Sequence, residues 1–139
     1  MATGLEKALK TVDIKGKAYV TVNERIKYFR EHFTGYSLIS EIVYNNEAKY
    51  LTWQENGETR GAWKSAEICF KASILNENKE VVATGYAMEK ADSSYINKTS
   101  YVENCETSAW GRALANFAIG VYSSVASADE VANAIKNQK

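Results

Sequence analysis

The sequence predicts an α+β fold in which an antiparallel sheet of three to four strands packs against one long helix. Three observations lead to this prediction. Segments rich in Ile, Val and Tyr are grouped in the middle of the chain, between Tyr36 and Lys90. Helical patterns flank this group on both sides, and the segments within it are joined by short turn signals. Strands grouped between helices favour an α+β fold over a parallel α/β fold.

Length and composition indicate a single soluble domain, 1–139. The chain has 139 residues with 45% hydrophobic and 24% charged residues, which are ordinary values for a globular protein. Residues 1–10 lack the apolar core of a signal peptide, and no apolar stretch is long enough to span a membrane. We therefore expect a cytoplasmic protein, in the host-cell cytoplasm if a phage encodes it.

The cysteine and histidine content predicts no metal site and no cofactor. Cys69, Cys105 and His32 cannot form a structural zinc site without carboxylates, and no ligand-pair spacing is present. Each cysteine lies inside a patterned segment, so we expect both to be buried free thiols in a reducing compartment.

The first helix is predicted from a capping box at Thr21–Glu24, in which a hydroxyl caps the first turn and a Glu three residues later reaches back. Gly35 is expected to end it. Before it, residues 1–17 look like a loose lead-in with a short helical possibility at 5–10. Three apolar residues share one face of the helix, namely Ile26, Phe29 and Phe33.

The central strands follow from alternation and turn chemistry. The clearest is 66–74, in which small or apolar residues alternate with mostly polar ones. Asn56-Gly57 is a strong signal for a tight hairpin turn. The other segments that favour strands are 36–44, 50–53, 60–64 and 80–90.

A long closing helix is predicted from a second capping box, Ser100–Glu103, to about Ile119, with Gly120 as its stop. A third box at 127–130 predicts a short C-terminal helix. The long helix carries two stripes, a small-residue stripe of Cys105, Ala109 and Ala113 and a bulky stripe of Trp110, Leu114 and Phe117. Two separate stripes allow one helix to face its own sheet and a neighbouring subunit.

The search for catalytic groups gives little, and we expect no enzyme. No Gly-rich phosphate loop is present. The one catalytic alternative pairs Cys105, near a helix N-terminus, with His32 as base in a cysteine hydrolase. A solvated His32 and a buried Cys105 are the plainer interpretation.

Aromatic and basic residues mix in the region 93–120, where Tyr95, Lys98, Tyr101 and Arg112 surround a loop and a helix start. A helix N-terminus suits a phosphate, and aromatic faces suit unpaired bases. The zero net charge opposes nucleic-acid binding in general, although a neutral chain can carry a local basic groove. The region therefore predicts a single-strand binding groove.

Two segments resemble a known family, namely 17–36 and the run Trp110–Phe117. They resemble phage single-strand annealing proteins of the Sak type, which are similar to the eukaryotic Rad-type recombination mediators. The stretch 97–109 resembles sequences that recur in small proteins of phages of Gram-positive bacteria. The resemblance covers about 17–120. It implies a β-β-β-α core over 18–120, followed by a C-terminal loop and short helix over 121–139.

The resemblance also implies a function and an assembly. Members bind the backbone of single-stranded DNA in a positive groove and leave the bases exposed for pairing. They form homo-oligomeric rings or filaments and promote ATP-independent annealing in homologous DNA recombination. The candidate DNA-binding residues are Arg112, Lys98, Lys90, Lys71, Tyr95, Tyr101, Tyr19 and Lys17.

The chain departs from the family pattern at several of these positions. Arg112 is the one basic residue that matches the family's closing helix, since Gly111 and Ala115 occupy neighbouring basic positions. Tyr19 matches the family's groove tyrosine approximately. The loss of these charges implies either weaker DNA binding or a groove built from Lys71, Lys90 and Lys98 instead.

Two alternatives stay open. The chain could be a phage single-stranded DNA-binding protein with a five-stranded OB-type barrel, although its long closing helix counts against that fold. It could also be a phage protein that binds a host protein, because protein interfaces are enriched in aromatic residues. A salt-sensitive gel shift with single-stranded DNA separates the second alternative from both DNA-binding hypotheses.

Overall fold

The computed structural model describes residues 11–15, 17–92, 97–119, 127–129 and 131–132. No helix in these ranges is long and apolar enough to cross a membrane. Near the C-terminus, the helical residues are Ala128, Asp129, Val131 and Ala132. The main elements are β1 (Thr11–Ile14), β2 (Lys17–Val20), α1 (Val22–His32), β3 (Ser37–Asn46), β4 (Lys49–Glu55), β5 (Glu58–Lys64), β6 (Glu67–Leu75), β7 (Val81–Lys90) and α2 (Asn97–Asn116).

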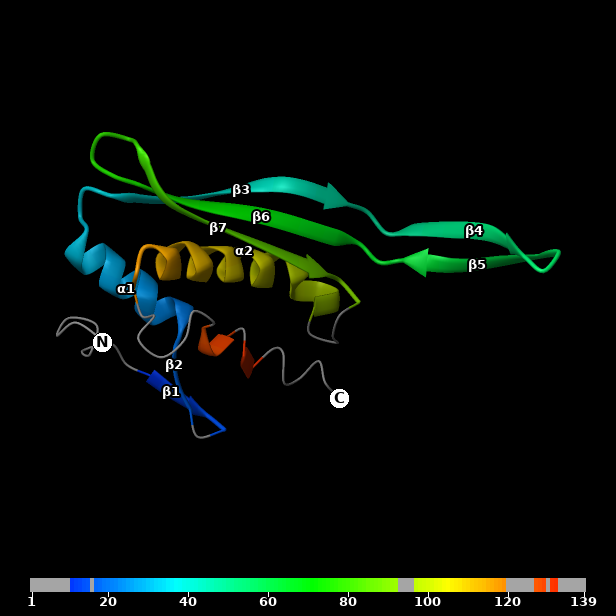
Figure 1. The fold of residues 1–139 in the computed structure, drawn as a ribbon, viewed down its shortest axis with the longest axis horizontal. Helices are drawn as coiled ribbons and strands as arrows, with labels where there is room; N and C mark the ends of the chain where they lie inside the picture. Colours follow the sequence, from blue (N-terminus) through cyan, green and yellow to red (C-terminus); the bar gives the residue numbers. More distant parts are fainter. Residues whose placement is uncertain (1–10, 16, 93–96, 120–126, 130, 133–139) are drawn as a thin grey trace.

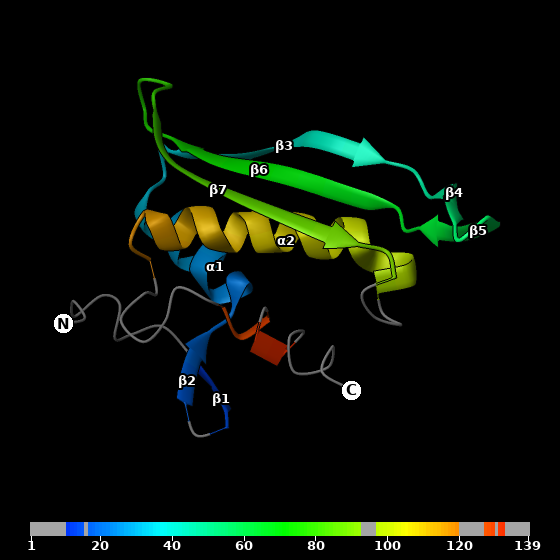
Figure 2. The same ribbon diagram turned by 45° about the vertical axis from the view of Figure 1, so that its right-hand side comes forward.

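The predicted α+β architecture is confirmed. β3, β6 and β7 form an antiparallel sheet in the order β3-β6-β7, and α2 packs against β7 and β6 on one face of it (Figure 1). α1 crosses beneath α2, and none of the described helices lies on the opposite face of the sheet (Figure 2). The sheet therefore has three strands, since β4 and β5 pair only with each other.

The hairpin β4–β5, residues 49–64, is called the arm. β3 leads into it and β6 follows it, so it continues the long direction of the sheet beyond the helices (Figure 1). Every residue of its two strands is exposed. Each strand of the arm packs mainly against the other, whereas the sheet strands also pack against α2.

Alternation along β6 builds the core, as predicted. Ile68, Phe70, Ala72 and Ile74 are buried in one cluster with residues of α2. On α2, the small-residue stripe and Leu114 are fully buried, and Trp110 and Phe117 pack against the same cluster. Both stripes thus face one core, and the expected division of α2 between its own sheet and a neighbouring subunit is wrong.

α1 begins as predicted and ends earlier than predicted. The Thr21 hydroxyl accepts a hydrogen bond from the Glu24 N–H at 3.1 Å, and Asp129 adds a second cap by accepting from the Val22 N–H at 2.8 Å. The helix ends at His32, and the Phe33 N–H still donates to the Phe29 carbonyl. Gly35 does not take a positive φ and is not the cap that we expected.

α2 starts three residues before the predicted cap, at Asn97, so Ser100 lies inside the helix. Its C-terminus forms a Schellman motif, in which the N–H of Ile119 donates to the Leu114 carbonyl and that of Ala118 to the Ala115 carbonyl. Ala118 takes the left-handed conformation, with φ 73°. The predicted stop, Gly120, lies outside the described residues.

The lead-in contains structure that the sequence did not reveal. β1 and β2 form an antiparallel hairpin in which Val12 pairs with Tyr19. The β-branched and aromatic residues of this stretch favour strands, so the predicted loose lead-in over 1–17 is wrong for β1 and for the start of β2. The possible helix at 5–10 lies outside the described residues.

Replacing Gly85 with alanine should destabilise the fold. A Cβ at this position would collide with the backbone nitrogen of Ala113 and lie 2.7 Å from Arg112 Cβ, so α2 would have to move away from β7. Overpacking of this kind costs about 1–3 kcal/mol. The matched control is Gly35→Ala, whose Cβ would meet the flexible side chain of Glu77. Thermal denaturation should show a lower Tm for Gly85→Ala alone, and equal shifts for both variants would contradict this packing.

Candidate nucleic-acid interface

The arm is a regular hairpin around the predicted Asn56-Gly57 turn. Both turn residues have positive φ, 52° and 79°, as the preferred two-residue hairpin turn requires. The register then pairs residues outward from the turn, and the last pair at the base of the arm is Lys49 with Lys64. Like charges directly opposite each other destabilise a strand pair. The base of the arm thus carries an electrostatic conflict.

A hollow of about 470 Å³ lies where β3 passes into the arm. Both lysines of the cross-strand pair line it. Its remaining lining residues are Asn45, Asn46, Glu47 and Ala48. The site therefore combines two ammonium groups with two side-chain amides, which are all hydrogen-bond donors to an anion.

A second hollow, of about 290 Å³, joins the arm to the start of α2. Lys64, Trp63, Lys98 and Asp92 line it, together with Ala48, Ser65, Ala66 and Ala91. Lys98 lies in the first turn of α2, which holds no acidic residue. The N-terminus of a helix carries positive partial charge, so a lysine there is disfavoured unless an anion is near. We call the residues that line these two hollows the neck.

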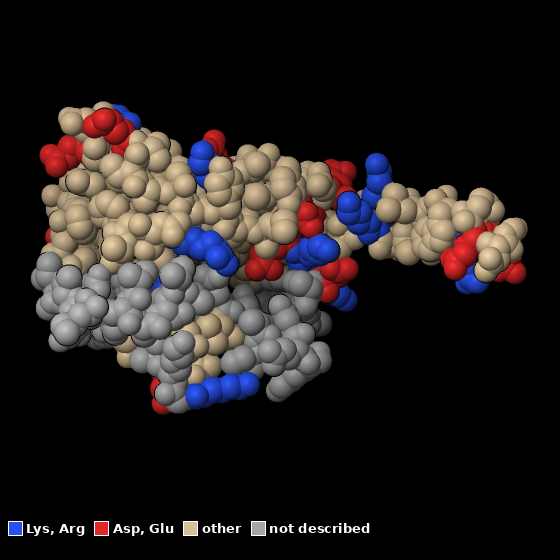
Figure 3. Space-filling model, viewed as in Figure 1, with Lys and Arg blue, Asp and Glu red and all other residues tan. Residues whose placement is uncertain are grey.

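The neck holds three lysines, Lys49, Lys64 and Lys98, and two carboxylates, Glu47 and Asp92. Figure 3 shows basic side chains gathered where the arm leaves the body, with acidic side chains close by. Arg60, near the far end of the arm, forms ion pairs with Glu55 and Glu58. None of the three neck lysines has an ion-pair partner among the described residues.

The uncovered face of the sheet carries two more of the predicted cations. Lys71 on β6 lies opposite Tyr86 on β7, with its Nζ 5.7 Å from the centre of the tyrosine ring. Lys90 lies opposite Glu67, four residue pairs closer to the arm. This face thus presents two lysines, one of which lies beside an exposed aromatic ring.

Tyr44, on the same face, is held by a hydrogen bond. Its hydroxyl donates to Glu67 Oε1 at 2.8 Å. This hydrogen bond to the carboxylate is the main cause that raises the pKa of Tyr44 to about 12, because it favours the protonated phenol.

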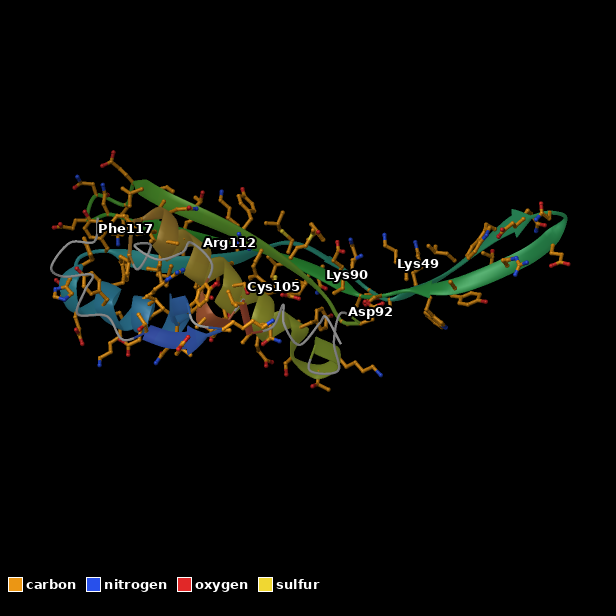
Figure 4. The ribbon with its side chains drawn as sticks, turned by 60° about the horizontal axis from the view of Figure 1, so that its bottom comes forward. Lys49, Lys90, Asp92, Cys105, Arg112 and Phe117 are labelled. Atoms are coloured by element: carbon orange, nitrogen blue, oxygen red, sulfur yellow. The ribbon has the colours of Figure 1, made fainter. Side chains whose placement is uncertain are left out.

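Arg112 is exposed on α2, while Trp110 packs against the core, so the predicted opposite orientation of the two side chains is confirmed. Fourteen residues separate Arg112 from Lys98, which is about 21 Å along a helix axis. Figure 4 shows Arg112, Lys90, Asp92 and Lys49 in that order along the molecule toward the arm. The basic residues therefore extend from the neck along the β7 side of the body.

The remaining predicted site residues lie elsewhere. Tyr101 packs against the core. Tyr19 is half-buried on β2, and Lys17 belongs to the same strand, far from the arm in Figure 1. Tyr95 lies outside the described residues. Of the predicted residues that the structure describes, Lys98 is the one that lines the neck.

Sequence reasoning missed Lys49, Lys64 and Trp63, although a signal for them was present. Once Asn56-Gly57 is accepted as a two-residue turn, counting outward pairs Lys49 with Lys64 and Tyr50 with Trp63. The proximity of these residues to Lys98 could not be predicted from the hairpin register, because it depends on how α2 packs.

Comparisons with known proteins give one match. Residues 62–117 are similar to a protein family described as the Slr1353 N-terminal dsRNA-binding domain-like family. The match spans the end of β5 with β6, β7 and α2, which is less than half of the chain. It includes Trp63, Lys64 and Lys98 of the neck. No curated protein and no solved structure matches the chain.

The cysteine hydrolase alternative does not fit the structure. Cys105 is fully buried between α2 and the sheet, with its Sγ 3.2 Å from the Ala87 carbonyl oxygen. Burial is the main cause that raises the pKa of Cys105 to about 11, whereas a nucleophile requires a lowered value. His32 is exposed at the end of α1, where its ring lies 4.4 Å from that of Tyr28.

Cys105 should resist alkylation in the folded protein at pH 8. The thiolate is the reactive form, and its fraction should rise only as the pH approaches 11. Because the folded-state pKa lies above the ordinary value of 9, the stability associated with this thiol is present below pH 9 and is lost from 9 to 11. Iodoacetamide labelling followed by mass spectrometry tests this, with urea-unfolded protein as the control. Equal labelling rates at pH 8 in both samples would contradict it.

Proposed function

We propose that this chain binds single-stranded DNA and promotes the annealing of complementary strands in phage recombination. The observation that carries the proposal is the neck, where two lysines oppose each other across a hairpin and a third occupies the positive end of a helix. Each placement is unfavourable in the free protein and favourable beside an anion. Local violations of this kind are expected at functional sites.

A nucleic-acid backbone fits this arrangement better than a single small anion. Basic residues continue from the neck to Lys90 and Arg112, so the positive charges form an extended series, and a strand offers an extended series of phosphates. The family that matches residues 62–117 has a description that refers to double-stranded RNA-binding domains. This description supports nucleic acid as the general class of partner.

The exposed aromatic residues favour a single strand. Trp63 is 71% exposed and lies beside the neck lysines, and Tyr86 is 52% exposed beside Lys71. Bases stack on such rings only when they are not already stacked in a duplex. Double-stranded RNA is the second candidate, favoured by the family description. Competition between single-stranded DNA and duplex RNA for the same protein separates the two.

The annealing step and the assembly are extensions of the resemblance in 17–36 and 110–117. Annealing is downhill once complementary strands meet, so the proposal requires no nucleotide hydrolysis and no cofactor. A homo-oligomer would hold a long strand on a continuous series of necks, in the host-cell cytoplasm where phage DNA recombines. Sedimentation with and without DNA tests this part of the proposal.

The two alternatives fare differently. A five-stranded barrel is wrong for the described residues, because their central sheet has β3 and β7 as edges and one long helix on its face. The exposed aromatic residues also fit a protein-only partner. It predicts no salt-dependent binding of DNA, which a gel shift at two salt concentrations decides.

The double variant Lys49→Ala/Lys64→Ala should weaken single-stranded DNA binding and slow ATP-free annealing of labelled strands. The loss of each of the two charge-assisted contacts should cost about 1.5–3 kcal/mol. The slope of log affinity against log salt should fall by about 0.7 for each contact. The control is Lys27→Ala/Arg30→Ala, which removes the same charge from exposed positions of α1. The Tm of the neck variant should not fall, since the change relieves repulsion, and equal binding by both variants would overturn the site.

Arg112→Ala should weaken the same binding by roughly 1–3 kcal/mol, because a guanidinium can grip two phosphate oxygens at once. The salt dependence should become shallower by about one phosphate contact per subunit. Folding should change little, as exposed ion pairs contribute little. A salt titration with a melting curve as control makes the measurement. Unchanged affinity and slope would remove Arg112 from the interface, and a collapsed melting curve would assign it to the fold.

A further inference from the structure

The arm holds aromatic side chains in solvent at a distance from the core. Tyr50, Trp53 and Trp63 are all exposed, and the strands that carry them pack mainly against each other. An isolated two-stranded hairpin is marginally stable in water. Apolar rings displayed on such a hairpin therefore indicate a ligand or partner rather than a structural role.

The two faces of the arm differ. Because side chains alternate along a strand, Tyr50 and Trp63 form a pair on one face, and Trp53 lies opposite Arg60 on the other. The Tyr50 and Trp63 rings contact edge to face, with 5.4 Å between centroids and 65° between planes. The second face carries charged pairs at both ends, Lys49 with Lys64 and Glu55 with Glu58. Trp63 therefore belongs to an uncharged aromatic face.

Gly61 sets the position of this aromatic pair. A Cβ at Gly61 would collide with the Tyr50 side chain, so the missing side chain lets the tyrosine ring lie over β5. The Tyr50 ring in turn contacts the Trp63 ring in a T-shaped arrangement. The Trp63 side chain is still 71% exposed, more than any other large apolar side chain described. The indole is thus supported from one side and open to solvent.

Trp63 also lines the hollow that contains Lys64 and Lys98. Two ammonium groups beside an open indole match the two parts of a nucleotide, a phosphate and a base, and this complementarity selects the occupant. Deepening the proposed function and resting on it, we propose that Trp63 stacks on an unpaired base of the strand whose phosphates bind the neck lysines. Trp63 then selects single strands, because a duplex buries the faces of its bases.

Stacking at this position has a consequence for pairing. One base per subunit is held against the arm, while the neighbouring bases on the β7 side of the body stay free for a complementary strand. Trp63 is therefore a specificity-determining residue, which distinguishes a strand with bases from a bare polyanion of the same charge.

The experiment compares two ligands of equal length and charge, an oligothymidylate and an oligodeoxynucleotide with abasic sites throughout. The wild-type protein should bind the oligothymidylate at least about five-fold more tightly, since stacking one base corresponds to about 5- to 150-fold in affinity. Trp63→Ala should abolish this preference and leave affinity for the abasic strand unchanged. Trp53→Ala, on the other face of the arm, is the matched control and should keep the preference. Trp63→Phe retains an aromatic face and should keep most of the preference for the oligothymidylate.

The outcomes separate this inference from the proposed function. Equal binding of both ligands by the wild type, or an unchanged preference in Trp63→Ala, overturns the stacking role and leaves the phosphate site intact. Failure of the wild type to bind either ligand overturns the proposed function itself. If Trp63→Ala instead dissociates an oligomer without changing the preference, the aromatic face binds a second copy of this chain and the stacking role is wrong.

Discussion

The close approach of α2 to the elements on both of its sides is the constraint on which the rest of the structure depends. On one side, Gly85 leaves no room for a Cβ between β7 and the backbone of Ala113. On the other side, a Cβ at Gly111 would lie 2.8 Å from the Val22 side chain of α1, and the Arg25 guanidinium donates to the Gly111 carbonyl at 2.8 Å. A fully buried arginine is costly unless its donors are used, so this bond fixes where α1 crosses α2.

The same constraint positions the candidate site. A helix held along β7 brings its first turn to the end of the sheet where β3 and β6 pass into the arm (Figure 1). Lys98 on α2 and Lys64 on β5 thereby line one hollow, although 34 residues of sequence separate them. The site is thus made by two elements whose relative position depends on glycines far from it. Packing at Gly85 and electrostatics at the neck are linked through one rigid helix.

The features that sequence reasoning predicted are those governed by local rules. Alternation over 66–74, the Asn56-Gly57 turn and the Thr21 cap depend on neighbouring residues, and each is present. The same rules misplaced the start of α2, because Ser100 has the signature of a cap but sits inside a longer helix. Arg25 was also missed, since burial of a charged residue depends on an acceptor 86 positions away. The neck could be predicted only in part, because a hairpin register can be counted whereas the approach of a helix cannot.

A chain with zero net charge can carry such a site because the electrostatic conflicts are small and local. A cross-strand pair of like charges costs roughly 0.2–1 kcal/mol. A charge at the wrong end of a helix costs about 0.3–1 kcal/mol. Native domains have a stability of about 5–15 kcal/mol, so the fold tolerates both without compensation elsewhere. An anion that relieves both conflicts recovers that energy on binding, in addition to its direct contacts with the lysines. The neck thus favours a phosphate backbone because the fold brings its positive charges together. The net charge of the whole chain does not reveal this local arrangement.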